Sequence, residues 1–193
     1  YTVRRGLNRA TQMRRQPGSA LKPLAVYGPA LELGYTTASV LLDEKTSFGG
    51  YTPRNAGDRY YGLVTMRTAI RNSLNTTAVR LLEEIGLDAS IQYLNKMGIP
   101  TRNSDRNLSL ALGSMTYGVT PVELAAAYVP YANGGIYHQP YCVERIETVD
   151  ESNVYERKDR GKQVLSAQNA FLMTSLLQSV VSSGTGTRML AAN

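Results

Sequence analysis

The chain has 193 residues, of which 42% are hydrophobic and 19% charged. This length suits one domain, and the apolar content is too high for a disordered tail. No apolar run reaches the roughly 18 residues of a membrane span, and the opening Tyr1–Arg5 has no apolar segment, so we predict no signal peptide. Cys142 and His138 are the only residues of their types. They exclude an internal disulfide and a cysteine or histidine cage for a metal, so we expect no metal and no cofactor.

The charge balance of 21 basic and 15 acidic side chains gives a net charge of +6. Five arginines fall in the first fifteen residues: Arg4, Arg5, Arg9, Arg14 and Arg15. Such a cluster is compatible with a solvated face, an anionic wall or membrane surface, or nucleic acid. Because no zinc finger, RNP-type sequence or basic heptad accompanies it, we expect no nucleic-acid partner.

The first half of the chain predicts helices separated by one long connection. A helix is expected from residues 17–19 to Leu33, with Pro29 bending or breaking it. Residues 35–62 are rich in glycine and read as an irregular connection. Helical apolar spacing returns from 65 to 99, where we expect Gly86 to end one segment and Asp88 to cap the next.

The second half predicts two helices and a hairpin. Residues 120–123 (TPVE) combine an N-cap threonine, a first-turn proline and a third-position glutamate, so a helix should run to about Ala132. Two strands, Tyr137–Val149 and Val154–Arg157, are expected to pair. His138 then lies at a turn entering a strand, and since no G-x-S-x-G elbow occurs we expect a structural or exposed histidine. A last helix should begin near Ser166 and end by Gly184.

Residues 15–23 (RQPGSALKP) carry the first candidate chemistry, a Ser-x-x-Lys at an expected helix N-terminus. Positions i and i+3 share a helix face, so the Lys22 amine can approach the Ser19 hydroxyl. A serine needs a base to become a good nucleophile, and a lysine serves when burial or a second cation lowers its pKa. An N-cap serine beside a solvated lysine is the competing interpretation of the motif alone.

A Ser-x-Asn follows at Ser73 and Asn75, between two helical patterns. A turn there can face Ser19, so Ser73 could relay a proton and Asn75 could hold a substrate amide. A helix cap is again the structural alternative.

Taken in order, these motifs resemble the transpeptidase domain of class A penicillin-binding proteins. The resemblance covers essentially the whole chain and also rests on residues 8–11 (NRAT), 117–128 (YGVTPVELAAAY), 132–135 (ANGG) and 183–187 (SGTGT). It implies an α+β fold of the penicillin-binding protein and serine β-lactamase type. We expect residues 1–193 to form part of one such domain, mainly its helical portion, with a β-hairpin near 136–157 and most of the central sheet missing.

By this resemblance the catalytic residues are Ser19, the acylated nucleophile, Lys22, its base, Ser73, the proton relay, and Asn75, which orients the substrate. The implied reaction is D,D-transpeptidation of peptidoglycan stem peptides ending in D-Ala-D-Ala, with β-lactams as mimics of the donor. The implied parent protein is membrane-anchored at the extracytoplasmic face of the bacterial cell membrane. A class A β-lactamase is less well matched, because Leu74 stands where its aspartate is expected and residues 92–95 (QYLN) lack its glutamate.

One family motif is absent from the sequence. No Lys-Thr-Gly or Lys-Ser-Gly occurs, and Lys45-Thr46-Ser47 lacks the glycine. In the family that motif follows SGTGT shortly, so we expect a truncated portion of a longer transpeptidase that is weak or inactive by itself. A non-catalytic helical module that binds wall polymer or partner proteins is the alternative. Without a covering sheet, exposed apolar helix faces would favour a homo-oligomer.

Overall fold

The computed structural model describes residues 6–150 and 152–192. The opening segment Tyr1–Arg5 lies outside the described residues. The predicted lack of a signal peptide and two arginines of the basic cluster fall in this segment. The helices over the described residues are η1 (Gly18–Leu21), η2 (Pro23–Tyr27), α1 (Gly28–Glu32), η3 (Ala56–Asp58), α2 (Met66–Arg71), α3 (Asn75–Ile85), α4 (Leu87–Lys96), η4 (Asn103–Asp105), η5 (Leu108–Leu112), α5 (Pro121–Ala132), α6 (Ala167–Ser183) and η6 (Thr187–Ala192).

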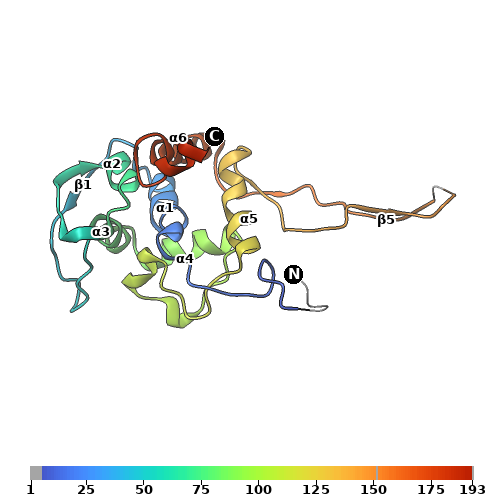
Figure 1. Ribbon diagram of the computed structural model, residues 1–193, viewed down its shortest axis with the longest axis horizontal. Coiled ribbons are helices and arrows are strands. Elements are labelled where there is room, and N and C mark those ends of the chain that lie inside the picture. The colour runs from blue at the N-terminus through green and yellow to red at the C-terminus, as the bar shows by residue number, and fades with distance from the viewer. Residues whose placement is uncertain (1–5, 151, 193) are drawn as a thin grey trace.

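The strands over the described residues form three separate two-stranded antiparallel sheets. Their bounds are β1 (Val40–Asp43), β2 (Gly62–Thr65), β3 (Ile136–Tyr137), β4 (Arg145–Glu147), β5 (Asn153–Glu156) and β6 (Lys162–Gln163). β1 pairs with β2, β3 with β6, and β4 with β5. Helices surround the η2–α1 segment on one side of the molecule, and the β4–β5 hairpin extends far away from them (Figure 1).

One hydrophobic core unites the helical part, and the η1–η2–α1 segment runs through it. Leu21, Leu24, Val26 and Tyr27 are fully buried there. Helix α6 packs on both α2 and α5, and α4 packs on η2. The residues after Gly18 are therefore held from several sides, which suits a segment that positions reactive groups.

The predicted helix ends are largely present, with two corrections. Thr120 and Glu123 form the predicted reciprocal cap of α5, and Ser166 caps α6. The helix expected over 17–33 is instead a succession of 3₁₀, π and α turns, and Pro29 lies in the first turn of the α part rather than breaking it. Asp88 does not cap α4, because Gly86 occupies the N-cap position.

The strands needed more correction than the helices. The connection over residues 35–62 was expected to be irregular. It instead contains strand β1 at Val40–Asp43, which pairs with β2 at the end of the connection. The predicted strand Tyr137–Val149 is only β3 and β4, separated by residues 138–144, which include Pro140 and are not a strand. Proline cannot donate to a sheet ladder, which explains part of this interruption. The hairpin over 145–156 is present.

Candidate active site

The four predicted site residues lie around the same place in the fold. Ser19 belongs to η1, Lys22 follows η1 directly, and Ser73 and Asn75 flank the junction of α2 and α3. A pocket of about 230 Å³ has Ser19, Lys22 and Ser73 in its wall. Its remaining lining residues are Ala20, Pro23, Ile70, Tyr128, Leu177, Val180 and Thr185. The structure therefore brings together two motifs that are about fifty residues apart in the sequence.

The Lys22 amine lies on the Ser-x-Asn side of this pocket. Lys22 Nζ is 2.6 Å from Asn75 Oδ1, 2.7 Å from the Ser73 carbonyl oxygen and 3.1 Å from Ser73 Oγ. The residue is only 2% exposed, and this burial lowers its pKa from 10.5 to about 8. A lysine in this state is roughly one-tenth neutral at pH 7 and half neutral at about pH 8, far more than an ordinary lysine, so it can accept a proton.

Ser19 is exposed at the pocket mouth, at the start of the buried segment. Within the described residues no hydrogen bond joins Ser19 Oγ to Lys22 Nζ, although both line the same pocket. Gly18 before it has φ +58°, a conformation that favours glycine. The serine is thus open to a ligand, while the residue three positions later is enclosed.

Two contacts fix the backbone that leads to Ser19. Arg15 and Val119 exchange backbone hydrogen bonds of 2.8 and 3.0 Å. A Cβ on Gly113 would lie 2.1 Å from the Gly18 carbonyl oxygen, so this close approach requires glycine. The residues between η5 and α5 therefore form a backbone support for the serine.

Tyrosines that the sequence analysis missed hold the irregular helix. Because η1 and η2 are not regular α-helix, some of their carbonyl oxygens accept from side chains instead. Tyr128 Oη donates to the Ala20 carbonyl at 2.6 Å, and Tyr131 Oη donates to that of Pro23 at 2.9 Å. Burial raises the pKa of both hydroxyls, so they stay protonated donors. Their i, i+3 spacing on the predicted helix was the available signal.

The SGTGT segment reaches the same pocket from α6. Thr185 lines it, and the Thr185 backbone N–H donates to the Arg71 carbonyl oxygen at 3.1 Å. A Cβ on Gly184 would lie 2.3 Å from that same oxygen. This segment therefore packs against the end of α2, next to the turn that carries Ser73.

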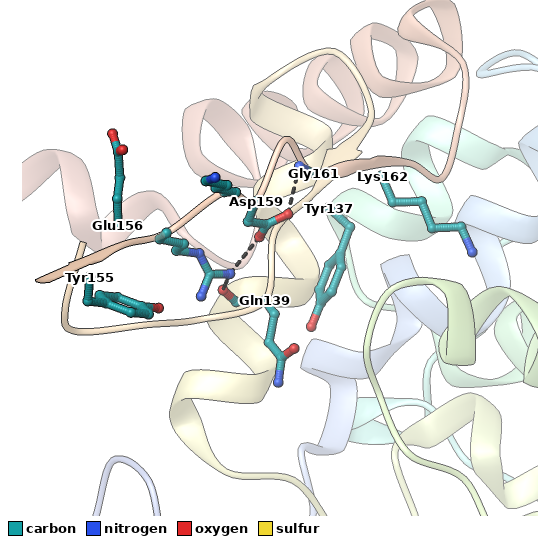
Figure 2. Close-up of a pocket in the computed structure, with 9 residues that line it drawn as sticks. Tyr137, Gln139, Tyr155, Glu156, Asp159, Gly161 and Lys162 are labelled. Carbon is teal, nitrogen blue, oxygen red and sulfur yellow. Dashed lines mark hydrogen bonds and ion pairs between the residues drawn. The ribbon is translucent and has the colours of Figure 1, made fainter. Parts of the chain in front are cut away.

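A second hollow, of about 600 Å³, lies beside the base of the β4–β5 hairpin and has a different character (Figure 2). Two of its charged groups pair with each other, since Arg157 donates to Asp159 at 2.5 Å, and Arg157 also donates to the Gln139 carbonyl oxygen at 2.9 Å. His138 lies 3.7 Å from Asp159, at the edge of the same region and partly exposed, which fits a structural histidine. This hollow contains no nucleophile with a base, so we place the chemistry at the Ser19 pocket.

Comparison with known proteins decides the family. The family model described as "Penicillin binding protein transpeptidase domain" matches residues 3–192. The chain belongs to this family. It is 45% identical to penicillin-binding protein 1F of Bacillus subtilis over 97% of its own length and 26% of that protein. Against penicillin-binding protein 4 of the same organism the identity is 38%, over 93% and 29%.

Solved structures of penicillin-binding proteins share this fold. Penicillin-binding protein 1A from Haemophilus influenzae superimposes with a TM-score of 0.82 at 28% identity, over 96% of this chain and 34% of that one. Penicillin-binding protein A from M. tuberculosis, solved as an imipenem acyl-enzyme complex, has the same fold with a TM-score of 0.79 at 24% identity, over 90% and 45%. The chain spans about a quarter of the length of the curated relatives it matches. No helix over the described residues is long and apolar enough to cross a membrane.

Proposed function

We propose that this chain carries the acyl-enzyme site of a serine D,D-transpeptidase, with Ser19, Lys22, Ser73 and Asn75 as its catalytic residues. One observation supports this most directly. A buried lysine whose pKa is lowered lies between the Ser73 hydroxyl and the Asn75 amide, in the pocket that also exposes Ser19. Perturbed bases that face an exposed nucleophile are typical of covalent catalysis.

In the proposed reaction Ser19 Oγ attacks the carbonyl carbon of the D-Ala-D-Ala bond while its proton passes to Lys22 Nζ. The tetrahedral intermediate then collapses, and the carbon–nitrogen bond breaks. A proton travels from Lys22 through Ser73 Oγ, 3.1 Å away, to the leaving amine. D-alanine departs, and Ser19 holds the stem peptide as an ester. A stem-peptide amine that attacks this ester forms the cross-link and restores the hydroxyl.

Acylation by a β-lactam follows the same first step, except that the leaving nitrogen stays attached to the adduct. No Lys-Thr-Gly or Lys-Ser-Gly occurs among the 193 residues. By the family resemblance, the strand that carries this motif supplies one oxyanion-hole N–H. Because loss of a single such donor slows catalysis by roughly 10²–10³-fold, we expect slow acylation by this chain.

The test is incubation with a fluorescent penicillin, followed by mass mapping of the labelled peptide. The proposal expects one adduct on Ser19, absent from Ser19→Ala and retained by Ser47→Ala, which alters an exposed serine in the loop after β1. If Ser19→Ala is labelled as strongly as the unaltered chain, the assignment fails. Lack of acylation in both this chain and its full-length parent would favour the non-catalytic wall-binding module.

We also propose that the longer parent protein is membrane-anchored and works at the extracytoplasmic face of the bacterial membrane, where stem peptides are found. For the chain by itself we propose self-association. Phe171 is 72% exposed, and an apolar groove of about 530 Å³ lies between α5 and α6. Light scattering of the isolated chain checks this, and a monomer at all concentrations contradicts it.

A further inference from the structure

The start of α3, which carries Asn75, has no cap of its own. Its N-cap residue is Leu74, whose side chain offers no acceptor. The first N–H groups of a helix have no partner within the helix and lose stability when they are left unsatisfied. Something from elsewhere in the chain must therefore accept from the N–H groups of Asn75 and Thr76.

Asn55, twenty residues earlier in the chain, supplies this acceptor. Its Oδ1 accepts from the backbone N–H of Asn75 at 2.7 Å and from that of Thr76 at 3.3 Å. Its Nδ2 donates to Asp43 Oδ1 at 2.7 Å and to the Arg59 carbonyl oxygen at 2.9 Å. All polar atoms of this side chain are used, so its amide has only one orientation that satisfies them.

A buried carboxylate keeps Asn55 in that orientation. Asp43 is fully buried and Asn55 is 5% exposed. Besides Asn55, Asp43 accepts from the Thr76 hydroxyl and, at 2.9 Å, from the Tyr61 N–H. Asp43 comes from β1 and Tyr61 directly precedes β2, so the β1–β2 hairpin anchors the network. A buried carboxylate satisfied by three donors resists displacement, because each donor would lose its partner.

The same loop also sets the orientation of the Asn75 side chain. Asn75 Nδ2 donates to the Arg54 carbonyl oxygen at 2.7 Å, so its Oδ1 is left to face Lys22 Nζ at 2.6 Å. Residues 54 and 55 thus hold both the backbone and the side chain of Asn75. The Lys22 amine contacts uncharged oxygens of Ser73, Leu74 and Asn75. Asp43 is the titratable group that contacts Asn55, and its negative charge acts in turn on Tyr27.

We infer that Asn55 is a positioning residue for acylation, acting as a remote cap that orients Asn75 and keeps water from the Lys22 amine, with Asp43 as its anchor. This inference rests on the proposed function for its catalytic consequence. Loss of the Asn55 side chain frees the α3 end and opens the site behind Lys22. Because burial is what lowers the pKa of Lys22, water entry should raise it.

The experiment measures the Lys22 titration directly, without any ligand. Only five lysines occur in the sequence, so carbon-13 NMR of labelled lysine gives few signals, and Lys22→Arg identifies the relevant one. The unaltered chain should titrate near pH 8. In Asn55→Ala the midpoint should rise by about one pH unit, which lowers the neutral fraction below pH 8 about tenfold. The acylation rate by fluorescent penicillin should fall by a similar factor.

Ile99→Val serves as the control, because it removes one methyl group from a fully buried residue of the core and touches none of this network. It should lower thermal stability and leave the Lys22 midpoint unchanged. A folded Asn55→Ala with the midpoint of the unaltered chain overturns the inference. If Asn55→Ala does not fold, Thr76→Val, which removes one donor to Asp43, decides in the same way. Absence of any penicillin adduct in both the unaltered chain and its full-length parent would overturn the proposed function, yet the Lys22 midpoints would still test Asn55.

Discussion

In the proposed reaction Lys22 is the base, so its protonation state should determine the rate of acylation. Since burial lowers its pKa to about 8, acylation of Ser19 should accelerate with rising pH and level off above about pH 8. Lys22→Arg should acylate about 10²–10⁴-fold more slowly, because a guanidinium stays protonated and cannot act as base. Rates with a fluorescent penicillin from pH 6 to 9.5 check both expectations. A rate that is independent of pH would argue against Lys22 as the base.

The same buried amine makes stability depend on pH. The pKa of Lys22 is lower in the folded chain than in the unfolded one, so between about pH 8 and 10.5 the unfolded chain binds more protons. The free energy of unfolding should therefore rise with pH across this window, relative to Lys22→Met. Urea unfolding of both proteins at pH 7, 8, 9 and 10 measures the difference. If the free energies of unfolding of both proteins change with pH in parallel, Lys22 is not buried in the folded chain.

The backbone of Ser73 is strained. Its φ of 52° is unusual for a residue with a side chain, and such conformations persist where neighbouring structure enforces them. The enforcing contacts here include the Lys22 bonds to the Ser73 carbonyl oxygen and hydroxyl. This turn lies in the place where the motif spacing predicted one, and its strain agrees with the role proposed for Ser73.

At the scale of elements, the approach of η5 to η1 can be tested with a matched pair of glycines. Gly113 and Gly134 both have φ +79°, so alanine costs roughly 1 kcal/mol of backbone strain at either position. Only at Gly113 does the added Cβ meet other atoms, the nearest belonging to Gly18. Gly113→Ala should thus unfold at lower urea concentration than Gly134→Ala and slow the acylation of Ser19. Equal stability and equal rates would remove the role of this contact.

The cap of α5 offers a simpler prediction. Thr120 Oγ1 accepts from the Glu123 backbone N–H at 3.1 Å, and Glu123 Oε2 accepts from the Thr120 backbone N–H at 2.9 Å. Thr120→Ala should lower the free energy of unfolding by about 1 kcal/mol. Ser166→Ala, which removes the corresponding cap of α6, should cost a similar amount. Chemical denaturation of the two variants provides the comparison, and no loss in Thr120→Ala would show that the cap is dispensable.

The helices could be predicted from sequence because their signals are local. Thr120, Pro121 and Glu123 lie within four residues of each other and describe one helix start. Short strands carry weaker signals, so β1 was missed, and the partner of β3 was not foreseen. The π turn at η2 depends on Tyr131 and other side chains from distant helices, which no local pattern reveals.

The proximity of the candidate site residues was predictable to the same extent. Ser19, Lys22, Ser73 and Asn75 belong to short motifs, and their meeting in the fold agrees with that prediction. Asp43 and Asn55 were not found, because an aspartate and an asparagine in a glycine-rich connection look like ordinary turn residues. Only their burial and their bonds to Thr76 and Asn75 distinguish them.

For the whole molecule, the arrangement is a helical body with a hairpin that extends away from it (Figure 1). The Ser19 pocket belongs to the helical body. Helices α5 and α6 contribute Tyr128, Leu177 and Val180 to the pocket, and they also present the apolar groove beside it. The pocket and the exposed apolar surface are therefore neighbours. Any protein surface that covers the groove will also border the Ser19 pocket.

The most direct test of the proposed nucleophile is the site of covalent attachment by a penicillin. After incubation at pH 8.5, proteolysis and mass spectrometry should place one adduct on the peptide that contains Ser19, and Lys22→Arg should reduce its amount strongly. Attachment to Ser73 or to another side chain, with Ser19 unmodified, would contradict the central claim that Ser19 is the nucleophile and Lys22 its base.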